Sequence, residues 1–396
     1  MSLEFSTIAL NDIVSLVIDY RGKTPKKLGA DWSESGIRAL SAKNIKTGKI
    51  IREDAIRYVD RELYHKWMKD EIKRNDILIT SEAPFGEVFF WDSDEKIVLS
   101  QRLFGVRCDE NKVDPKFIYF YMTSEMFQWE LQSRATGTTV KGLRQPELLK
   151  CEIQLPNRDN QTKISYILSN IESKINVLKE LNKNLEEQLS LIFDDYFVKC
   201  SAYDEDSLVK TDWGKIPKEW KNIDFGELIQ ITSGDRPDEK SETKTSEFNI
   251  PLFGASKIMG YTKEYSYDED ILIIGRVGTH GVVQRVNYPC FPSDNTFVIK
   301  SKYYGFVYQL LKRIDYDSLN TGSTQPLITQ KSLKTVNVIL PDENSLSKFE
   351  KISKVFFDKI YLNQNEITSL TKLRDTLLPK LMSGEIDVSK INCDLE

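Results

Sequence analysis

The sequence predicts an α+β protein in which two similar mixed α/β domains are separated by two long helices that form an intramolecular antiparallel coiled coil. Three observations predict this fold class. An apolar seam with a period of 3.5 residues occupies residues 162–197, a second seam begins at Phe349, and the residues before each seam repeat one another at the scale of a domain. Such a repeat predicts an internal pseudo-twofold axis rather than a solenoid, whose repeats are far shorter.

The first seam is typical of a coiled coil, because apolar side chains recur in alternating steps of three and four residues. At ~1.5 Å per residue the helix would be roughly 50 Å long, and Asp159 or Asn160 can cap its first turn. A core helix of a globular domain is the alternative, but that helix would be shorter and would have a wider apolar face. The seam positions are Ile164, Leu168, Ile171, Ile175, Leu178, Asn182, Leu185, Leu189, Ile192 and Tyr196.

The second seam also contains one asparagine near its middle. Its spacing places Asn363 at a d position, whereas Asn182 occupies an a position, and a packs against d in an antiparallel pair. Two facing amides can bond each other and select one register, whereas a parallel pair would set Asn182 against Ile367. The predicted partners are Ile164 with Leu381, Ile175 with Leu370, Leu178 with Ile367, Asn182 with Asn363, Leu185 with Ile360, Leu189 with Phe356, and Tyr196 with Phe349.

The repeat identifies matching segments on either side of the first helix. The apolar run 76–80 matches 270–274, the polar loop 135–139 matches 320–324, and 154–156 matches 339–341. An aromatic-rich helix is expected from Asp114 to about Gln132. The predicted boundaries are 1–158 for the first domain, 159–199 for the first long helix, 200–212 for a solvated linker, 213–343 for the second domain, 344–384 for the second long helix and 385–396 for a C-terminal tail.

The composition predicts a folded soluble protein of two or three domains, since 396 residues exceed one core and 40% are hydrophobic. No apolar run approaches a membrane span, and the first ten residues lack the pattern of a signal peptide. The five cysteines are odd in number and have no CxxC spacing, which favours a reducing cytoplasm and excludes a zinc site of that type. Because the net charge is −5, any nucleic-acid-binding face must be local.

Catalytic motifs are missing from the sequence. The two histidines, His65 and His280, are too few and too isolated for a triad or a metal cluster. There is no GxxxxGK[ST], no GxGxxG that opens a helix, and no methylase-type Asn/Asp-Pro-Pro-aromatic tetrapeptide. We therefore expect no catalytic centre, no metal site and no bound cofactor. An enzyme that carries its own recognition domains remains a rival interpretation, against which these absences count.

Polar loops with cations and amides remain as candidates for recognition. Arginine and lysine suit guanine edges and phosphates, and asparagine and glutamine suit adenine edges. Solvated surface charge is the alternative for each residue taken alone. The candidates are Arg21, Lys23, Lys26, Lys43, Asn44, Lys141, Arg236, Lys257, Arg276, Thr321 and Ser323.

Three further segments carry a resemblance to a known family. Residues 153–156 with 161–164 (IQLP and QTKI), 213–220 (WGKIPKEW) and 377–386 (LLPKLMSGEI) resemble the specificity subunit of type I restriction-modification systems, often called HsdS. The resemblance covers essentially the whole chain. The recognition domains of this family are highly variable, so no base-contacting residue is carried over to this sequence.

The resemblance implies a non-catalytic subunit that recognises double-stranded DNA. Each domain would be a target recognition domain that reads one half of a split, asymmetric DNA site. The helices would act as a ruler between the halves and would dock modification subunits, typically two, which carry S-adenosylmethionine and methylate adenine. Restriction subunits would add ATP-driven translocation and cleavage. A coiled-coil scaffold without sequence-specific DNA recognition is the alternative.

Overall fold

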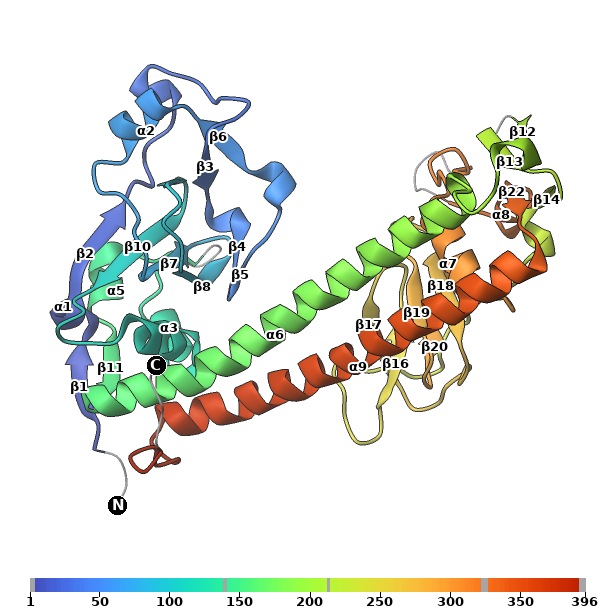
Figure 1. Ribbon diagram of the computed structural model, residues 1–396. Helices are drawn as coiled ribbons and strands as arrows, with labels where there is room; N and C mark the ends of the chain where they lie inside the picture. The colour runs from blue at the N-terminus through green and yellow to red at the C-terminus, as the bar shows by residue number, and fades with distance from the viewer. Residues whose placement is uncertain (1–3, 138–140, 212–213, 322–326, 392–396) are drawn as a thin grey trace. The chain divides into compact units, whose positions relative to one another are not determined.

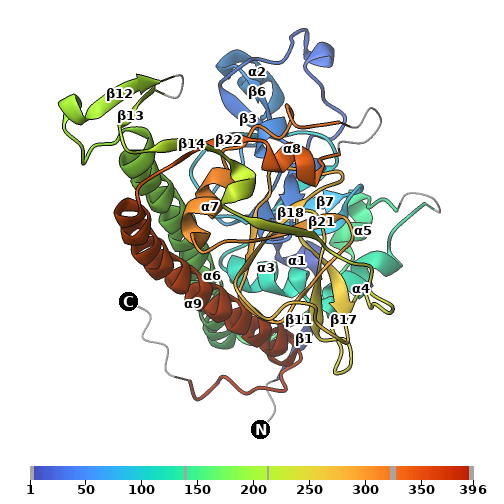
Figure 2. The ribbon, with the colours of Figure 1, turned by 90° about the vertical axis from the view of Figure 1, so that its right-hand side faces the viewer.

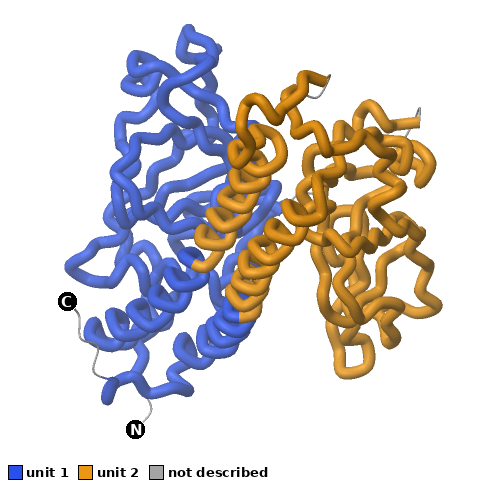
Figure 3. The backbone as a smooth tube through the Cα atoms, turned by 45° about the vertical axis from the view of Figure 1, so that its right-hand side comes forward, with its two compact units in different colours: residues 1–177, 366–396 blue, residues 178–365 orange. Residues whose placement is uncertain are grey.

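Residues 4–137, 141–211, 214–321 and 327–391 are described by the computed structural model drawn in Figure 1. The chain forms two compact units, shown in Figure 3. Unit 1 comprises Met1–Val177 with Glu366–Glu396, and unit 2 comprises Leu178–Asn365. Each unit therefore contains one mixed α/β body and a segment of both long helices, α6 (Arg158–Phe193) and α9 (Glu343–Met382).

Unit 1 is organised around a four-stranded antiparallel sheet in the order β2-β10-β7-β8. The strands are β2 (Val14–Asp19), β10 (Leu103–Cys108), β7 (Asp76–Ser81) and β8 (Phe85–Trp91). Every residue of β7 is buried, as expected for a central strand covered on both faces. One core cluster packs Ile77 and Ile79, whereas another packs Leu78, so successive side chains of β7 enter different cores.

Two smaller sheets and one short strand pair complete unit 1. The strands β6 (Arg57–Val59), β3 (Ile37–Leu40) and β9 (Ile97–Leu99) form one of them, in which β3 and β9 are parallel. In the other, β1 (Ser6–Ala9) pairs with β11 (Glu152–Leu155). The shorter pair and the helices outside the long pair are β4 (Ile45–Lys46), β5 (Lys49–Ile50), α1 (Leu10–Ile13), α2 (Arg61–Trp67), α3 (Pro115–Thr123), α4 (Glu125–Ser133) and α5 (Gln145–Leu149).

The single aromatic-rich helix predicted after Asp114 is wrong, because the segment forms two helices. Ser124 adopts an extended conformation (φ −71°, ψ 150°) that ends α3 and begins α4. Its hydroxyl accepts a hydrogen bond from the Phe127 amide at 3.4 Å, so Ser124 caps the second helix. The start of the segment is as expected, since Asp114 caps α3 through the Lys116 amide at 2.8 Å.

Unit 2 has the same strand connections. Its central sheet has the order β15-β21-β18-β19, a three-stranded sheet has the order β17-β16-β20, and β14 pairs with β22. The body also contains the helices α7 (Tyr304–Leu311) and α8 (Gln330–Lys334). The strands are β14 (Lys221–Asp224), β15 (Gln230–Ser233), β16 (Ile250–Phe253), β17 (Ile258–Thr262), β18 (Ile271–Gly275), β19 (Gln284–Val286), β20 (Phe291–Pro292), β21 (Thr296–Lys300) and β22 (Asn337–Leu340).

Equivalent backbone hydrogen bonds in the two units confirm the predicted duplication. They join the same strand ends and loops, and their lengths differ by no more than 0.1 Å within each pair. The two units therefore share one backbone frame, and the helices and loops in which they differ lie between these equivalent hydrogen bonds. The pairs are Leu10 N to Cys151 O with Phe225 N to Val336 O, Ser81 N to Arg102 O with Arg276 N to Asn295 O, Ser100 N to Leu40 O with Ser293 N to Phe253 O, and Thr136 N to Gly142 O with Thr321 N to Leu327 O.

The linker predicted at 200–212 is a folded segment in its second half. Strand β12 (Leu208–Thr211) pairs in antiparallel fashion with β13 (Gly214–Pro217). Cys200, at the start of the segment, is buried in a core with Ile216 and Trp220. Residues 204–206 are exposed, as expected from their three acidic side chains.

Both long helices begin at equivalent capping residues. Asn157 Oδ1 accepts the Asn160 amide at 2.9 Å, and Asp342 Oδ1 accepts the Ser345 amide at 3.0 Å. The prediction that Asp159 or Asn160 caps the first helix is wrong, because the chain is already helical at Arg158 and the cap precedes it.

The helices run side by side and antiparallel, as Figures 1 and 2 show. In unit 1, Ile164 near the start of α6 shares a core with Leu381 near the end of α9. In unit 2, Leu189 shares a core with Phe349, and the rings of Tyr196 and Phe349 lie 6.3 Å apart. The antiparallel coiled coil within one chain is therefore confirmed.

The two seam asparagines of unit 2 are in contact. Asn363 Nδ2 donates to Asn182 Oδ1 at 2.8 Å, and Asn182 Nδ2 donates to the Ile360 carbonyl at 3.4 Å. Asn363 is 1% exposed, so its amide depends on this partner. That the contact selects the register is a prediction.

We expect Asn182→Leu to destabilise unit 2 by ~1–3 kcal/mol, because it leaves the buried Asn363 amide without its acceptor. Replacing both asparagines by leucine should restore stability while removing the preference for one register. Denaturant unfolding of the full chain measures both effects. Asn184→Leu, at an exposed position two residues away, is the matched control. A single variant as stable as the wild type would contradict the prediction.

We expect Asp342→Ala to cost ~1–2 kcal/mol, as for other lost helix caps. Burial opposes ionisation of Asp342, but hydrogen bonds from Tyr203, Ser345 and Trp220 outweigh it and hold the pKa well below its usual range. Because the pKa is lower in the folded state, the stabilisation is present above pH ~4 and is lost as the pH falls further. Denaturant unfolding at several pH values should show the wild type and the variant converging in acid. Asp358→Ala, on the exposed face of α9, should show no such convergence.

Candidate nucleic-acid interface

Loops from several parts of unit 1 meet at one edge of the central sheet. The Ser81 amide bonds the Arg102 carbonyl at 2.8 Å, and the Leu143 amide bonds the Ser81 carbonyl at 2.9 Å. The Ala42 amide bonds the Gln101 carbonyl at 3.0 Å. These backbone bonds hold the loops together regardless of their side chains, so the side chains are free to serve recognition.

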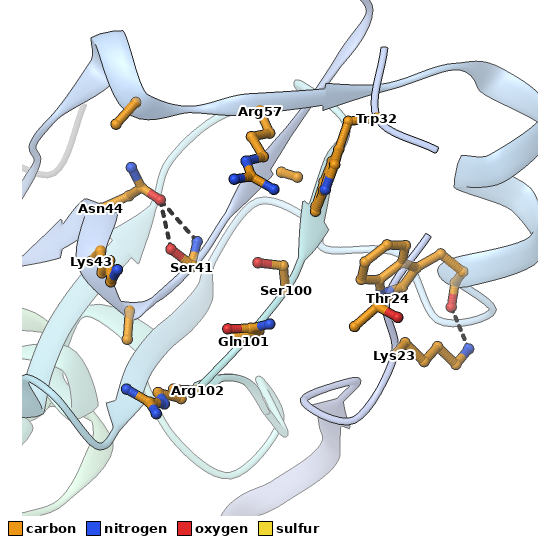
Figure 4. A pocket seen from close by; sticks show the side chains of 14 residues that line it. Lys23, Thr24, Trp32, Ser41, Lys43, Asn44, Arg57, Ser100, Gln101 and Arg102 are labelled. Atoms are coloured by element: carbon orange, nitrogen blue, oxygen red, sulfur yellow. Dashed lines mark hydrogen bonds between the residues drawn. The ribbon is translucent and has the colours of Figure 1, made fainter. Parts of the chain in front are cut away.

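A cleft of about 370 Å³ opens among these loops. Figure 4 shows Arg57 beside Trp32 at the top of the view, Ser100 and Gln101 in its middle, and Lys43 and Arg102 on the left. The Arg57 guanidinium lies 5.2 Å from the centre of the Trp32 ring, within the range of a cation–π interaction. The cleft thus combines an aromatic wall, cations and neutral hydrogen-bonding groups, which suit base edges and phosphates.

A second cleft of about 450 Å³ shares Gln101 and Arg102 with the first. Arg144 and Glu82 also line it, and Glu82 accepts an ion pair from Arg102 Nε at 2.7 Å. Among the described residues, Lys43 and Arg57 have no carboxylate within ion-pair distance, so their charge is available to an external anion.

Some of the candidate DNA-binding residues predicted from the sequence make contacts within the protein instead. Arg21 forms a two-bonded ion pair with Asp19, donates to the Leu143 carbonyl, and lies 3.9 Å from the Phe104 ring centre. Lys23 Nζ donates to the Trp67 carbonyl at 2.6 Å, and burial lowers the pKa of its ammonium. Both cations hold loops in place, although Lys23 also lines the first cleft.

Asn44 is also an internal residue. Its side chain is 4% exposed, its Oδ1 accepts from the Ser41 amide and hydroxyl, and its Nδ2 points at the carbonyls of Ile51 and Arg52. The amide therefore shapes the loop and does not face a ligand. Lys26, Lys43 and Lys141 are exposed, and of these Lys43 lines the cleft.

The sequence analysis did not single out Arg57, Trp32, Gln101 or Arg102. Gln101 and Arg102 immediately precede β10, at the position of Asp294 and Asn295 before β21. Matching these two strands across the repeat would have drawn attention to them. No local pattern marks Arg57 and Trp32, because their contact joins a strand to a distant loop.

The candidates in unit 2 lie on the equivalent loops. Lys257 is exposed, and its carbonyl accepts from the Gly254 amide at 2.8 Å. The Arg276 guanidinium lies 5.5 Å from the Phe297 ring centre. Thr321 bonds the Leu327 carbonyl through its hydroxyl at 3.2 Å, and Ser323 lies outside the described residues.

The chemistry around Arg236 differs from that of unit 1. Its guanidinium is 3.3 Å from Asp294, and the cleft that it lines, of about 360 Å³, also contains Asp235, Asp238 and Glu239. Asp294 stands before β21 where Gln101 stands before β10, so equivalent loops of the two units carry different side chains on one backbone frame. This difference suits the recognition of two different ligand surfaces.

Among the described residues, no group of three or more histidine, cysteine, aspartate or glutamate residues could hold a metal ion. Within the same residues, no helix has the length and apolarity that crossing a membrane requires.

Known proteins similar to this chain are specificity subunits. The type I restriction enzyme MjaIX specificity subunit of Methanocaldococcus jannaschii is 25% identical over 346 residues, covering 80% of this chain and 79% of that protein. The putative type I specificity subunit S.MgeORF438P of Mycoplasma genitalium is 27% identical over 303 residues, covering 72% and 76%.

The fold matches a solved structure over most of its length. The crystal structure of the type I restriction-modification S subunit from M. genitalium aligns with 96% of each chain, with a TM-score of 0.59 and 18% sequence identity. The family model for the type I restriction modification DNA specificity domain matches residues 3–187 and 217–372. The two matches together span most of the sequence, so the chain belongs to the family of type I restriction-modification specificity subunits.

Proposed function

We propose that this chain is the DNA-recognition subunit of a type I restriction-modification complex, and that each body reads one half of a bipartite, asymmetric DNA site. The observation that carries the proposal is that equivalent loops of the two units carry different side chains, with Gln101 and Arg102 before β10 and Asp294 and Asn295 before β21, in a chain that contains two specificity domains. A scaffold protein would need neither two such domains nor a cleft with unpaired cations.

The long helices are proposed to set the spacing between half-sites and to dock the modification subunits. Val355 and Leu362 are seven residues apart on α9, so they share a face, and their side chains are 68% and 61% exposed. Exposed apolar side chains on one face suit a protein partner. Two modification subunits would supply methyl transfer, and restriction subunits would supply translocation and cleavage, in the cytoplasm where the DNA lies. This chain would contribute no catalytic group and bind no cofactor.

Methylome sequencing of a host that expresses this chain with its modification subunit tests the proposal. A modified motif with two defined halves and a gap of constant length is the expected result. A continuous motif, or methylation without sequence preference, would contradict the proposal.

We expect Arg57→Gln to weaken reading of one half-site by ~1–3 kcal/mol while the other half stays unchanged. The reason is that Arg57 lines the cleft of unit 1 with a free guanidinium beside Trp32. The methylome of the variant shows which half becomes degenerate, and binding at several salt concentrations separates a base contact from a phosphate contact. Arg61→Gln, an exposed arginine of the same unit outside the cleft, is the matched control.

We also expect that adding one heptad to both long helices lengthens the gap in the motif by about three base pairs, since seven helical residues add ~10 Å. The heptads would be inserted after Ile175 in α6 and before Leu370 in α9, at partner positions of the predicted seam. Both half-sites should survive. An insertion in α6 alone should misalign the asparagines and abolish activity. An unchanged gap after the double insertion would rule out the ruler.

A further inference from the structure

In unit 2, a cluster of polar contacts fastens the body to α6. Glu186 of α6 lies at its centre. Its Oε1 is 2.6 Å from Arg285 Nη2, and its Oε2 accepts from the Tyr308 hydroxyl at 2.9 Å and lies 3.5 Å from Lys312 Nζ. One carboxylate therefore joins strand β19 and helix α7 to the long helix.

Arg285 also contacts a ring of α9 and a ring of α7. Its guanidinium lies 4.0 Å from the Phe357 ring centre and 5.0 Å from that of Tyr308. The side chains of Arg285 and Glu186 are 17% and 24% exposed. Burial raises the pKa of Tyr308, and the Glu186 charge adds to the effect, so the phenol remains a hydrogen-bond donor at neutral pH.

A second tie follows on the same face of α6. Arg313 Nη2 donates to Ser190 Oγ at 2.7 Å and to Asp194 Oδ1 at 2.8 Å. Glu186 and Ser190 of α6 are spaced by four residues, and Asp194, four residues further on, begins the π-helical turn that follows α6. This spacing places the three side chains on neighbouring turns of one face. Charge-assisted hydrogen bonds depend strongly on direction, so two such ties fix the orientation of the body on the helix as well as its contact.

Apolar packing alone would not fix that orientation. Leu189 and Phe193 of α6 pack with Phe306 of α7 in one core, which holds the body against the helix. Packing of this kind is non-directional and tolerates small rotations better than an ion pair does. The apolar core therefore holds the body against the helix, and the polar contacts fix the angle between them.

From this geometry we infer that Glu186 is a positioning residue that sets the angle of the second recognition domain on α6 and thereby the length of DNA spacer that the complex accepts. The inference rests on the proposed function. It assigns to Glu186 a part in spacer discrimination that is separate from the reading of either half-site. Breaking the tie relaxes the spacing while the base-reading loops stay intact.

The test compares Glu186→Gln with the wild type in the complete complex with its modification subunits. Plasmids carry both half-sites with the natural gap, one base pair fewer or one base pair more, and methylation of each is measured over time. The expected result is that the ratio of off-length to natural-length methylation rises at least about tenfold, the change that corresponds to 1.4 kcal/mol of lost discrimination. Both half-site sequences should be unchanged.

Two further variants separate orientation from general damage. Glu187→Gln removes the same charge from the neighbouring, exposed position and should keep the natural gap. Arg285→Gln should relax the gap as Glu186→Gln does, and the double variant should relax it no further, because both single changes break one contact. Milder loss is expected for Lys312→Gln, whose ammonium is the most distant of the three donors; this variant keeps the test open if Glu186→Gln does not fold.

Three outcomes would overturn the inference. They are an unchanged gap in a folded Glu186→Gln complex, a changed sequence in either half-site, and loss of all methylation by a folded and assembled complex. If the wild type itself has no bipartite motif, the proposed function fails first, and the two failures are thereby distinguished.

Discussion

The antiparallel pairing of α6 and α9 is the constraint on which the rest of the chain depends. A single helix of this length gains most of its stability from burial of its apolar face, so each seam requires the other. An apolar seam by itself tolerates a slip of one heptad, since apolar side chains recur at nearly every step. We expect the contact of Asn363 with Asn182 to make such a slip costly, because a displaced amide would lose its partner inside the pair.

The two units keep the same backbone frame but differ in the side chains that their loops present. Phe104 and Phe297 occupy equivalent places on β10 and β21, and each carries a guanidinium over its ring. In unit 1 the arginine is Arg21, which follows β2, whereas in unit 2 it is Arg276, which follows β18. The arginine–ring contact is thus retained while the residue that supplies it changes, so the loops can diverge without loss of the frame. A reader of two different half-sites needs this freedom.

Much of the fold follows from periodicity, and most of the site does not. The seams and the repeat are one-dimensional patterns, so the helices, their direction and the duplication could be predicted from the sequence. Local competition between hydrogen bonds decides three other features: the cap at Asn157, the break at Ser124 and the hairpin at Leu208. The spacing of apolar residues does not predict them. The candidate site depends on contacts between distant segments. Arg21 and Arg57 are alike in sequence, yet Asp19 neutralises the first, and the second has no carboxylate partner among the described residues.

Equivalent positions on the long helices are used in different ways in the two units. In unit 1, Ser165 of α6 donates to Asp114 Oδ2 at 2.9 Å, and Gln161 accepts from the Asp114 amide, so the cap of α3 is also its tie to the long helix. In unit 2, Glu350 stands at the position of Ser165 and itself accepts the amides of Gly305 and Phe306 at the start of α7. Burial raises the pKa of Glu350, since its desolvation outweighs these two hydrogen bonds. In unit 2 the charged group, Glu350, belongs to the long helix, whereas in unit 1 the charged group, Asp114, belongs to the body. Each body is therefore fastened to the long helices by its own set of polar contacts.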